Sequence, residues 1–301
     1  MRMAGTKDRF SQRHPLLFGV LMIILAMALV TGVMAFFRSM GWTPGSFALS
    51  GDKLGVVHVE GTILDASRVV AFIETLERDD SVKGVLLRVD SPGGAIAPSQ
   101  EIYAAIKKLN EIKPVIASYG SMAASGGYYC SCPARLIFAN PGSITASIGV
   151  MAEFVTVADA LEKFGIRPEV LTTGKYKAAG TPLRNLTDAQ REQMLDLMQD
   201  LHDQFVDDVA NARGIDRNRV AAIADGRAIT GRQAVSFGLV DRIGTESDAI
   251  EELKKQTGIE GRAALLEGPV EERTLLQEIM GSLKFDLSSS LPQQGWTFSF
   301  K

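Results

Sequence analysis

Two glycine-rich segments carry residues that could perform nucleophilic chemistry. Ser125 is followed by Gly126 and Gly127, and residues 90–94 read Asp-Ser-Pro-Gly-Gly. Glycines let backbone N–H groups approach a ligand closely, and a helix beginning at Ser125 would direct free N–H groups toward a developing negative charge. The pair of segments predicts a serine nucleophile beside an oxyanion hole. One Gly-Gly pair alone would be typical of a tight turn, and neither segment has the full spacing of a nucleotide-binding fingerprint.

A serine nucleophile requires a general base, and the three histidines are poor candidates for it. His14 precedes a long apolar segment, His58 alternates within an apolar run, and His202 lies in a helical pattern. A lysine can serve instead, but only when it is neutral, so we expect it among apolar and small neighbours. Lys177 is followed by two alanines and a glycine and meets this requirement. Lys175 remains an alternative, because residues two apart in an extended segment point the same way.

The elements that would position these segments alternate between strand and helix. Short apolar runs bounded by Gly, Pro, Asn or Asp predict buried strands at residues 54–59, 82–89, 115–118 and 136–139. Apolar residues at helical spacing fill the first two intervals: Val69, Phe72, Ile73 and Leu76, then Ile102, Ala105, Ile106 and Leu109. This alternation predicts βαβ crossovers, a mainly parallel sheet and chemistry at the carboxyl ends of the strands. Further on, Thr187 and Gln190 predict a capping box that opens a long helix.

Residues 16–37 form an uncharged apolar segment near the N-terminus. At about 1.5 Å per helical residue it is long enough to cross a hydrocarbon layer of about 30 Å. The basic residues that precede it are Arg2, Lys7, Arg9 and Arg13. We therefore expect a single-pass anchor in the inner (cytoplasmic) membrane, with the N-terminus cytoplasmic and the main domain on the exported, periplasmic or extracytoplasmic side. A signal peptide cleaved after residues 26–28, or a buried core helix, are the alternatives.

This expectation divides the chain into five parts: a cytoplasmic tail at 1–15, the anchor at 16–37, a linker at 38–52, the main domain at 53–262 and a C-terminal tail at 263–301. In the tail, Trp296, Phe298 and Phe300 alternate with polar residues, which predicts an extended segment with one aromatic face. Such a segment could pack on the parent domain as an edge strand or on the membrane surface. Alternatively, it could reach a catalytic cleft of its own or a neighbouring subunit as a substrate would.

Composition excludes several classes of function. Of the 301 residues 46% are apolar, and the formal net charge of -3 leaves no basic face for phosphate, so a folded core is expected and nucleic-acid binding is not. Cys130 and Cys132 are the only cysteines, so no disulfide framework exists and both are predicted to be small core residues. We expect no metal ion and no cofactor.

Five ordered blocks of the sequence resemble the signal peptide peptidases of the short, single-repeat bacterial form. The blocks are DSPGG at 90–94, GSMAASGGYY at 120–129, TASIGV at 145–150, GKYKAAGTPLR at 174–184 and ADGRAITGRQAVSFGLVDRIG at 224–244. The resemblance implies that Ser125 is the nucleophile and that Lys177, rather than Lys175, is the general base. It also implies that the N–H groups of Gly93 and Gly126 form the oxyanion hole and that the Ser147 hydroxyl positions the lysine. Ala178 departs from the Asp usual in the family at that position.

The resemblance further implies an α/β fold, the spiral of βαβ units shared by crotonases and the Clp protease proteolytic subunit. It implies a homo-oligomeric ring with active sites at subunit interfaces, and a serine endopeptidase that degrades remnant signal peptides after secretion. A membrane protease that cuts a stomatin-like partner would use the same serine and lysine. An acyl-CoA hydratase would need acidic catalytic residues at the strand ends, and an inactive scaffold would not need the intact Ser125 and Lys177.

Overall fold

The computed structural model describes residues 15–39, 51–269 and 298–300, and the chain divides into two units, Met1–Gly51 and Asp52–Lys301. In the first unit, helix α2 (Pro15–Ser39) is 25 residues long and carries exposed apolar side chains such as Ile23 and Leu29. The predicted membrane span at 16–37 therefore forms one helix. Nevertheless, within the described part of the chain no helix meets the length and apolarity of a membrane-crossing segment, so the structure does not support that expectation.

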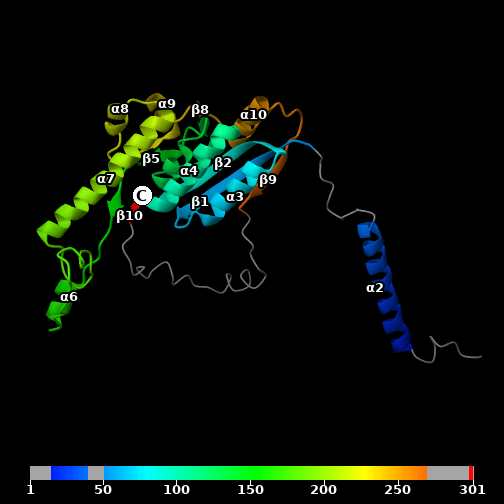
Figure 1. Cartoon of the computed structure of the whole chain (residues 1–301), viewed down its shortest axis with the longest axis horizontal. Coiled ribbons are helices and arrows are strands. Elements are labelled where there is room, and N and C mark those ends of the chain that lie inside the picture. Colours follow the sequence, from blue (N-terminus) through cyan, green and yellow to red (C-terminus); the bar gives the residue numbers. More distant parts are fainter. Residues whose placement is uncertain (1–14, 40–50, 270–297, 301) are drawn as a thin grey trace, which may run out of the picture. The chain divides into compact units, whose positions relative to one another are not determined.

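The second unit is an α/β domain built on one mixed sheet with mostly parallel pairing (Figure 1). Its strands in the described residues are β1 (Lys53–Ile63), β2 (Val82–Ala95), β3 (Val115–Ala124), β4 (Leu136–Ala139), β5 (Ile144–Ala146), β6 (Met151–Ala152), β7 (Ala228–Thr230), β8 (Arg242–Ile243), β9 (Ala264–Gly268) and β10 (Phe298–Phe300). Strands β1 to β4 pair in parallel in chain order, and β8 pairs in parallel with β4. The expected parallel sheet is confirmed.

Helices connect the parallel strands, as the alternating sequence pattern predicts. The helices of this unit are α3 (Ser67–Arg78), α4 (Ile96–Ile112), α5 (Gly126–Ser131), α6 (Ala158–Lys163), α7 (Asp188–Arg213), α8 (Arg217–Ala221), α9 (Gly231–Phe237) and α10 (Glu246–Thr257). Helix α3 joins β1 to β2, and α4 joins β2 to β3. Each crossover buries its apolar stripe, for example Ile73 and Leu76 of α3.

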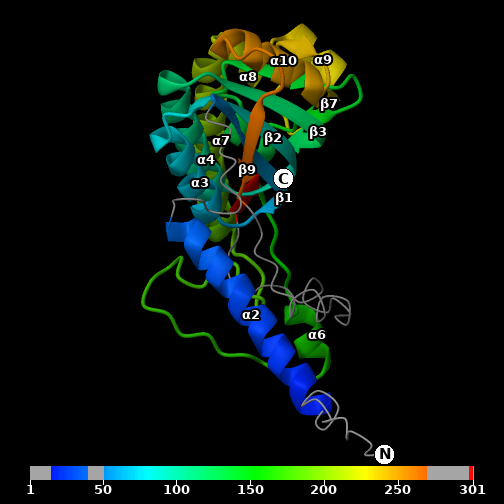
Figure 2. The same ribbon diagram turned by 90° about the vertical axis from the view of Figure 1, so that its right-hand side faces the viewer.

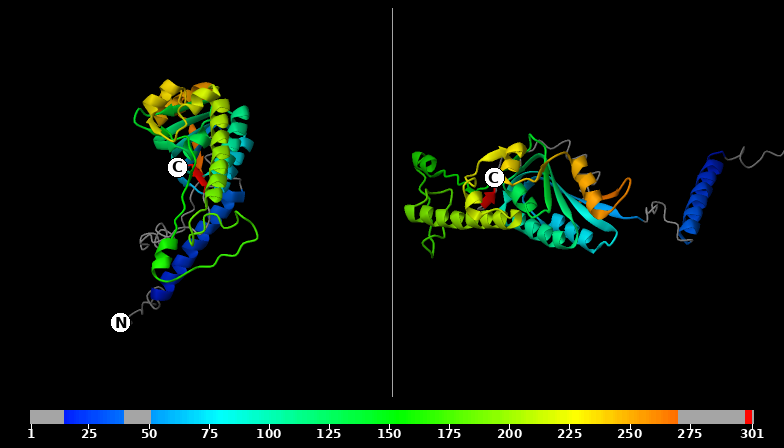
Figure 3. Two further views of the ribbon diagram at one scale, coloured as in Figure 1. Left: turned by 90° about the vertical axis from the view of Figure 1, so that its left-hand side faces the viewer. Right: turned by 90° about the horizontal axis from the view of Figure 1, so that it is seen from above.

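Alternation along the strands separates two cores, one on each face of the sheet. Val57 and Val59 belong to the larger core, which α3, α4, α5 and α7 cover, whereas Leu54 and Val56 belong to a smaller core under α10 (Figures 2 and 3). Cys130 and Cys132 lie fully buried in the larger core and form no disulfide, which confirms their predicted role. Burial raises the pKa of the Cys130 thiol to about 12.

Strands β2 and β3 run further than the sequence predicts. Residues 90–94, which lie beyond the strand predicted at 82–89, continue β2, because Thr62 and Ile63 of β1 pair with Gly93 and Gly94. Before this pairing the register of β2 shifts against both β1 and β3, which marks the segment as irregular strand. Similarly, β3 continues to Ala124, so Ser125 follows a strand directly.

Helix α7 begins with the predicted capping box and projects away from the sheet. The Thr187 hydroxyl accepts from the Gln190 N–H, and the Gln190 side chain accepts from the Thr187 N–H. The C-terminal half of α7 buries Phe205, Val206 and Val209 against the domain. Its N-terminal half extends beyond the sheet, and α6 lies at the same end (Figures 1 and 3).

Two segments of the predicted C-terminal tail are strands of this sheet. β9 pairs in parallel with β1, so the domain extends past residue 262, where the sequence pattern weakens. β10 pairs antiparallel with both β2 and β6 and is therefore flanked on two sides, unlike an edge strand. Trp296 lies outside the described residues.

Candidate active site

Ser125 occupies the turn between β3 and α5. Its backbone has φ 53° and ψ -116°, its side chain is fully buried, and its Oγ has no hydrogen-bond partner among the described residues. The backbone is fixed on both sides, because the Ser125 N–H donates to the Ala146 carbonyl at 2.7 Å and the Ser125 carbonyl accepts from Tyr129 at 2.8 Å. A hydroxyl in such a rigid setting without a partner is available for chemistry.

The segment around Gly93 lies directly against Gly126. A Cβ atom placed on Gly126 would lie 3.1 Å from Gly93 Cα and 3.2 Å from Gly94 N. Gly93 has φ 103°, a conformation that L side chains rarely adopt. The two glycine-rich segments predicted to surround the nucleophile are thus brought together. In this structure the Gly93 N–H donates to Ser91 Oγ at 3.1 Å, so it would have to change partner to bind an oxyanion.

Ser147 lies next to the residue that holds the Ser125 backbone. Ala146 and Ser147 both have positive φ, and the Ser147 hydroxyl donates to the Gly226 carbonyl at 3.1 Å. The Ser147 N–H donates to the Arg227 carbonyl at 3.0 Å. The chain at 224–227 therefore fixes Ser147 in place near Ser125.

Residues 224–227 are held by one contact from α7 and by an ion pair within the segment. His202 on α7 hydrogen-bonds the Ala224 carbonyl at 2.7 Å, and Arg227 pairs with Asp225. The hydrogen bonds from Arg227 lower the pKa of the Asp225 carboxyl to about 2. Residues 224–227 belong to the last of the five sequence blocks. Their hydrogen bonds to Ser147 give that block a structural role.

Lys177 lies in a different part of the domain from Ser125. Its side chain is exposed, and its N–H donates to the Gly174 carbonyl at 3.1 Å. The neighbouring Lys175 carbonyl accepts from Gln190 in the first turn of α7. Phe205, on the other half of α7, contacts the Tyr129 ring one turn from Ser125, with centroids 4.9 Å apart.

The fifteen residues between Gln190 and Phe205 correspond to about 22 Å of helix. Ser125, Gly93, Gly126 and Ser147 therefore lie toward the Phe205 end of this stretch of α7. The segment that contains Lys177 contacts the Gln190 end. Among the described residues Ser125 Oγ has no hydrogen bond to Lys177 or to any other group. Lys177 belongs to a projecting arm, defined here as residues 151–187, which carries exposed Phe164 and Leu171 at 82% and 86% exposure.

Sequence reasoning missed three polar residues that support the site. Ser91 Oγ donates to the Gly61 carbonyl at 2.6 Å and so links β1 to the Gly93 segment. Asp90 accepts from the Met122 N–H at 3.1 Å and fixes the end of β3. Ser99 is fully buried, and its Oγ would lie 2.6 Å from a Cβ on Gly126. Asp90 and Ser91 stand inside the DSPGG block, which was the available signal, whereas nothing in the sequence distinguishes Ser99.

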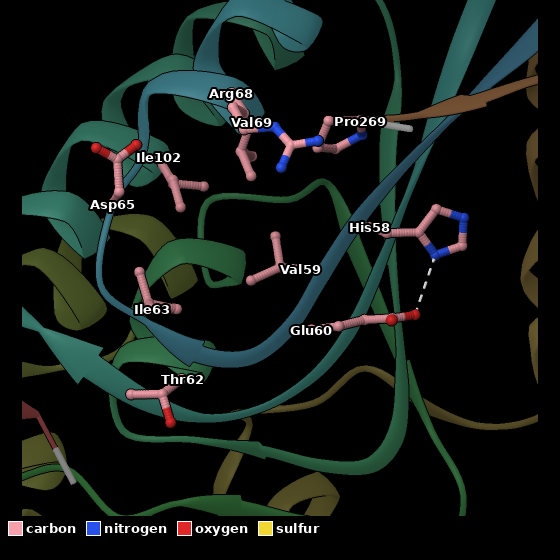
Figure 4. Close-up of a pocket in the computed structure, with 10 residues that line it drawn as sticks. All are labelled: His58, Val59, Glu60, Thr62, Ile63, Asp65, Arg68, Val69, Ile102 and Pro269. Carbon is pink, nitrogen blue, oxygen red and sulfur yellow. Dashed lines mark ion pairs between the residues drawn. The ribbon is translucent and has the colours of Figure 1, made fainter. Parts of the chain in front are cut away.

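A cavity of about 510 Å³ lies at the end of β1 and the start of α3, and its lining includes Thr62 and Ile63, which pair with Gly93 and Gly94 (Figure 4). Its polar lining includes His58, Glu60, Asp65 and Arg68, and His58 Nδ1 lies 3.4 Å from a Glu60 carboxylate oxygen. None of the predicted site residues lines this cavity.

The sheet with its connecting helices and the buried serine define an α/β domain of the Clp protease type. The Clp protease family profile matches residues 56–135, which contain most of β1, all of β2 and β3, and Ser125. A second profile, Peptidase family S49, matches residues 107–260. The chain belongs to peptidase family S49.

Curated relatives agree with this assignment. A putative protease of Synechocystis sp. is 36% identical over 231 residues, covering 76% of this chain and 83% of the relative. The putative signal peptide peptidase SppA of Enterococcus faecium is 37% identical and covers 69% of this chain and 64% of its own length. Protease 4 of Haemophilus influenzae is 32% identical over 68% of this chain, which corresponds to 35% of that longer protein.

Proposed function

We propose that this chain is a membrane-anchored serine endopeptidase that degrades cleaved signal peptides, with Ser125 as nucleophile and Lys177 as general base. The observation that carries the proposal is the buried Ser125 hydroxyl, which has no partner among the described residues and stands against two glycine-rich segments. The relatives named SppA and Protease 4 support a peptidase of this kind.

The proposed reaction begins when Ser125 Oγ attacks a peptide carbonyl carbon and transfers its proton to a neutral lysine amine. The carbonyl oxygen becomes an oxyanion, which the N–H groups of Gly126 and Gly93 would stabilise. The lysine then gives its proton to the leaving nitrogen, and an acyl-enzyme forms. Water attacks this ester with the lysine again as base, which releases the acid and restores Ser125.

The lysine of the proposed site comes from a second copy of the chain. Lys177 is exposed on the arm, and the arm starts about 22 Å of helix away from the end of α7 that contacts α5. Exposed apolar side chains on the arm, such as Val155, Phe164 and Leu171, would be buried against that copy. A ring in which each arm reaches the next subunit would complete every site.

Membrane anchoring by residues 16–37 is also part of the proposal and rests on the sequence. The segment is apolar and uncharged, and a basic N-terminal flank predicts that the main domain lies on the exported side. A reporter enzyme fused after Lys301 should be active only outside the cytoplasm. Activity of the same fusion inside the cytoplasm would exclude this orientation.

Mixing two inactive variants tests the shared site. Ser125→Ala and Lys177→Ala should each abolish cleavage of a fluorogenic signal-sequence peptide by the detergent-solubilised full-length chain. When the two are co-expressed in equal amounts, random assembly should restore about a quarter of the sites, because one in four contains an intact serine beside an intact lysine.

Lys175→Ala is the matched control for the lysine assignment, since Lys175 lies two residues away in the same exposed segment. It should keep most of the activity. No recovery on mixing would place the dyad within one subunit, and equal losses at positions 175 and 177 would reject Lys177 as the base.

A further inference from the structure

Ser91 carries a hydroxyl that serves two backbone groups at the edge of the proposed site. Its Oγ donates to the Gly61 carbonyl at 2.6 Å and accepts from the Gly93 N–H at 3.1 Å. The first distance is short for an O–H···O bond and the second is long for an N–H···O bond, so Gly61 holds the hydroxyl more firmly than Gly93 does. The side chain of Ser91 is fully buried. The Gly93 N–H is therefore the partner that can be exchanged at the lower cost.

The irregular pairing of β1 with β2 explains why a side chain takes part in backbone bonding here. The register between these two strands omits Gly61 on β1 and both Ser91 and Pro92 on β2. Pro92 has no N–H to donate. The Ser91 hydroxyl supplies a donor for the Gly61 carbonyl where the regular pairing is interrupted.

Ser91 and Gly93 both pack against the first turn of α5, which follows Ser125. A Cβ atom placed on Gly127 would lie 2.7 Å from the Ser91 carbonyl oxygen and 3.3 Å from Ser91 Cβ. A Cβ atom placed on Gly126 would lie 3.1 Å from Gly93 Cα. A hydrogen bond that fixes the direction of the Gly93 N–H consequently fixes one of the two donors proposed for the oxyanion.

We propose that Ser91 is a positioning residue of the oxyanion hole: its hydroxyl binds the Gly93 N–H while the site is empty and releases it when the tetrahedral intermediate forms. The inference rests on the proposed peptidase function. Gly93 is buried, and a buried N–H needs an acceptor before any oxyanion exists. In the transition state the N–H exchanges a neutral hydroxyl for a developing negative charge, with which it forms the stronger hydrogen bond.

Ser91→Ala in the full-length protein tests this exchange, because the Gly93 N–H then has no bond to Ser91 to break. For a fluorogenic signal-sequence peptide, kcat should rise by roughly threefold to tenfold with KM little changed, since the gain is confined to the transition state. The variant should at the same time be less stable in urea unfolding, because the Gly61 carbonyl loses its donor. Damage to the fold would lower kcat, so a rise in kcat separates positioning from a structural role.

Ser143→Ala is the matched control, since the Ser143 hydroxyl has the same two kinds of partner at the turn between β4 and β5. It donates to the Gly120 carbonyl at 2.6 Å and accepts from the Asn140 N–H at 3.2 Å, and its side chain is also buried. Ser143→Ala should lose stability without any rise in kcat. Ser91→Cys, whose thiol is a weaker acceptor, should raise kcat by less than Ser91→Ala does. No rise in kcat for Ser91→Ala, or an equal rise for Ser143→Ala, would overturn the proposal.

Labelling with a fluorophosphonate probe separates this inference from the peptidase assignment. In this reaction a bond forms between Ser125 Oγ and phosphorus, the P–F bond breaks, fluoride leaves and the serine proton passes to the base, while the phosphoryl oxygen gains negative charge in the oxyanion hole. Labelling should be faster for Ser91→Ala than for the wild type, unchanged for Ser143→Ala and absent for Ser125→Ala. If the labelling rates follow this order while no form cleaves peptides, the exchange at Gly93 stands and the proposed function fails. Peptide cleavage by the wild type, with no gain in labelling or in kcat for Ser91→Ala, rejects the exchange and leaves the proposed function in place.

Discussion

The backbone of Ser125 is in a conformation that is strained for any residue with a Cβ atom. A non-glycine residue at φ 53° and ψ -116° is destabilised by about 1–3 kcal/mol, and the surrounding hydrogen bonds to Ala146 and Tyr129 maintain it. Ser125→Gly should relieve this strain, whereas Ser125→Ala should retain it. We expect the glycine variant to be the more stable of the two by about 1 kcal/mol in urea unfolding, and both variants should be inactive. A less stable glycine variant would show that the turn is not strained.

The base should reveal itself in the pH dependence of the rate. A lysine base acts only when neutral, so peptide cleavage should decrease as the pH falls from about 8 to 5. Lys177→Arg should be inactive at every workable pH, because a guanidinium does not release its proton. A flat rate down to pH 5 would contradict a lysine base.

Titration in residues 224–227, which hold Ser147, does not account for a fall in rate between pH 8 and 5. Because the pKa of Asp225 is lowered to about 2, its ion pair with Arg227 contributes stability above the ordinary carboxyl range near 3.9. That contribution is lost only as the pH falls through about 2. Circular dichroism between pH 5 and 8 should therefore be unchanged while the rate falls.

At the scale of elements, the joint between α5 and α7 determines where the arm points. Tyr129 on α5 donates a short hydrogen bond to Asp208 and packs edge-on against Phe205, both on α7. Burial, followed by the Asp208 carboxylate, raises the pKa of Tyr129 well above its ordinary value. A small change at this joint would be magnified along the projecting half of α7.

Tyr129→Phe should therefore lower both stability, by about 1–3 kcal/mol, and kcat, because the hydrogen bond to a charged group is lost and α7 is less well fixed. Tyr128→Phe is the control: Tyr128 is equally buried, but its hydroxyl donates to the carbonyl of Leu239, which is not a residue of α7. It should lower stability in urea unfolding and leave kcat near the wild-type value. Equal losses of kcat in the two variants would argue against a positioning role for the joint.

The sequence predicts the long elements well and the short ones poorly. Runs of apolar residues predict the middle of β1 to β4, and Thr187 with Gln190 predicts the start of α7. Strands of two to five residues such as β6, β8 and β9 have no pattern of their own, because pairing with a neighbour makes them strands. The extra length of β2 depends in the same way on its pairing with β1.

Part of the candidate site could likewise be predicted from the sequence, and part of it could not. Glycine content leads to Ser125 and the segment at 90–94, and the family resemblance adds Gly93, Gly126 and Ser147. The structure gathers these four residues. The place of Lys177 could not be predicted, since it depends on tertiary contacts of the arm such as the hydrogen bond between Gln190 and the Lys175 carbonyl. The number of residues between Ser125 and Lys177 does not indicate how far apart they lie in space. The functional roles of Ser125, Gly93, Gly126, Ser147 and Lys177 stay predictions.

At the scale of the whole molecule, the arm is the predicted contact between subunits. Phe164→Ser with Leu171→Ser should reduce the assembly mass measured by analytical ultracentrifugation and abolish cleavage, because these exposed apolar side chains would lose their burial. Ile112→Ser, at an exposed position at the end of α4, should change neither. Full activity in a dissociated arm variant would exclude a site shared between copies.

The pairing of β9 with β1 has a practical consequence for shortened forms of the protein. Lys53 to Val57 of β1 find their partners in Ala264 to Gly268, so a fragment that stops at residue 262 would leave this stretch of β1 without its neighbour. Unpaired N–H and C=O groups on an apolar strand are a template for joining another chain. Fragments that end before Gly268 should therefore aggregate during expression, whereas fragments that retain β9 should keep the border of the sheet closed.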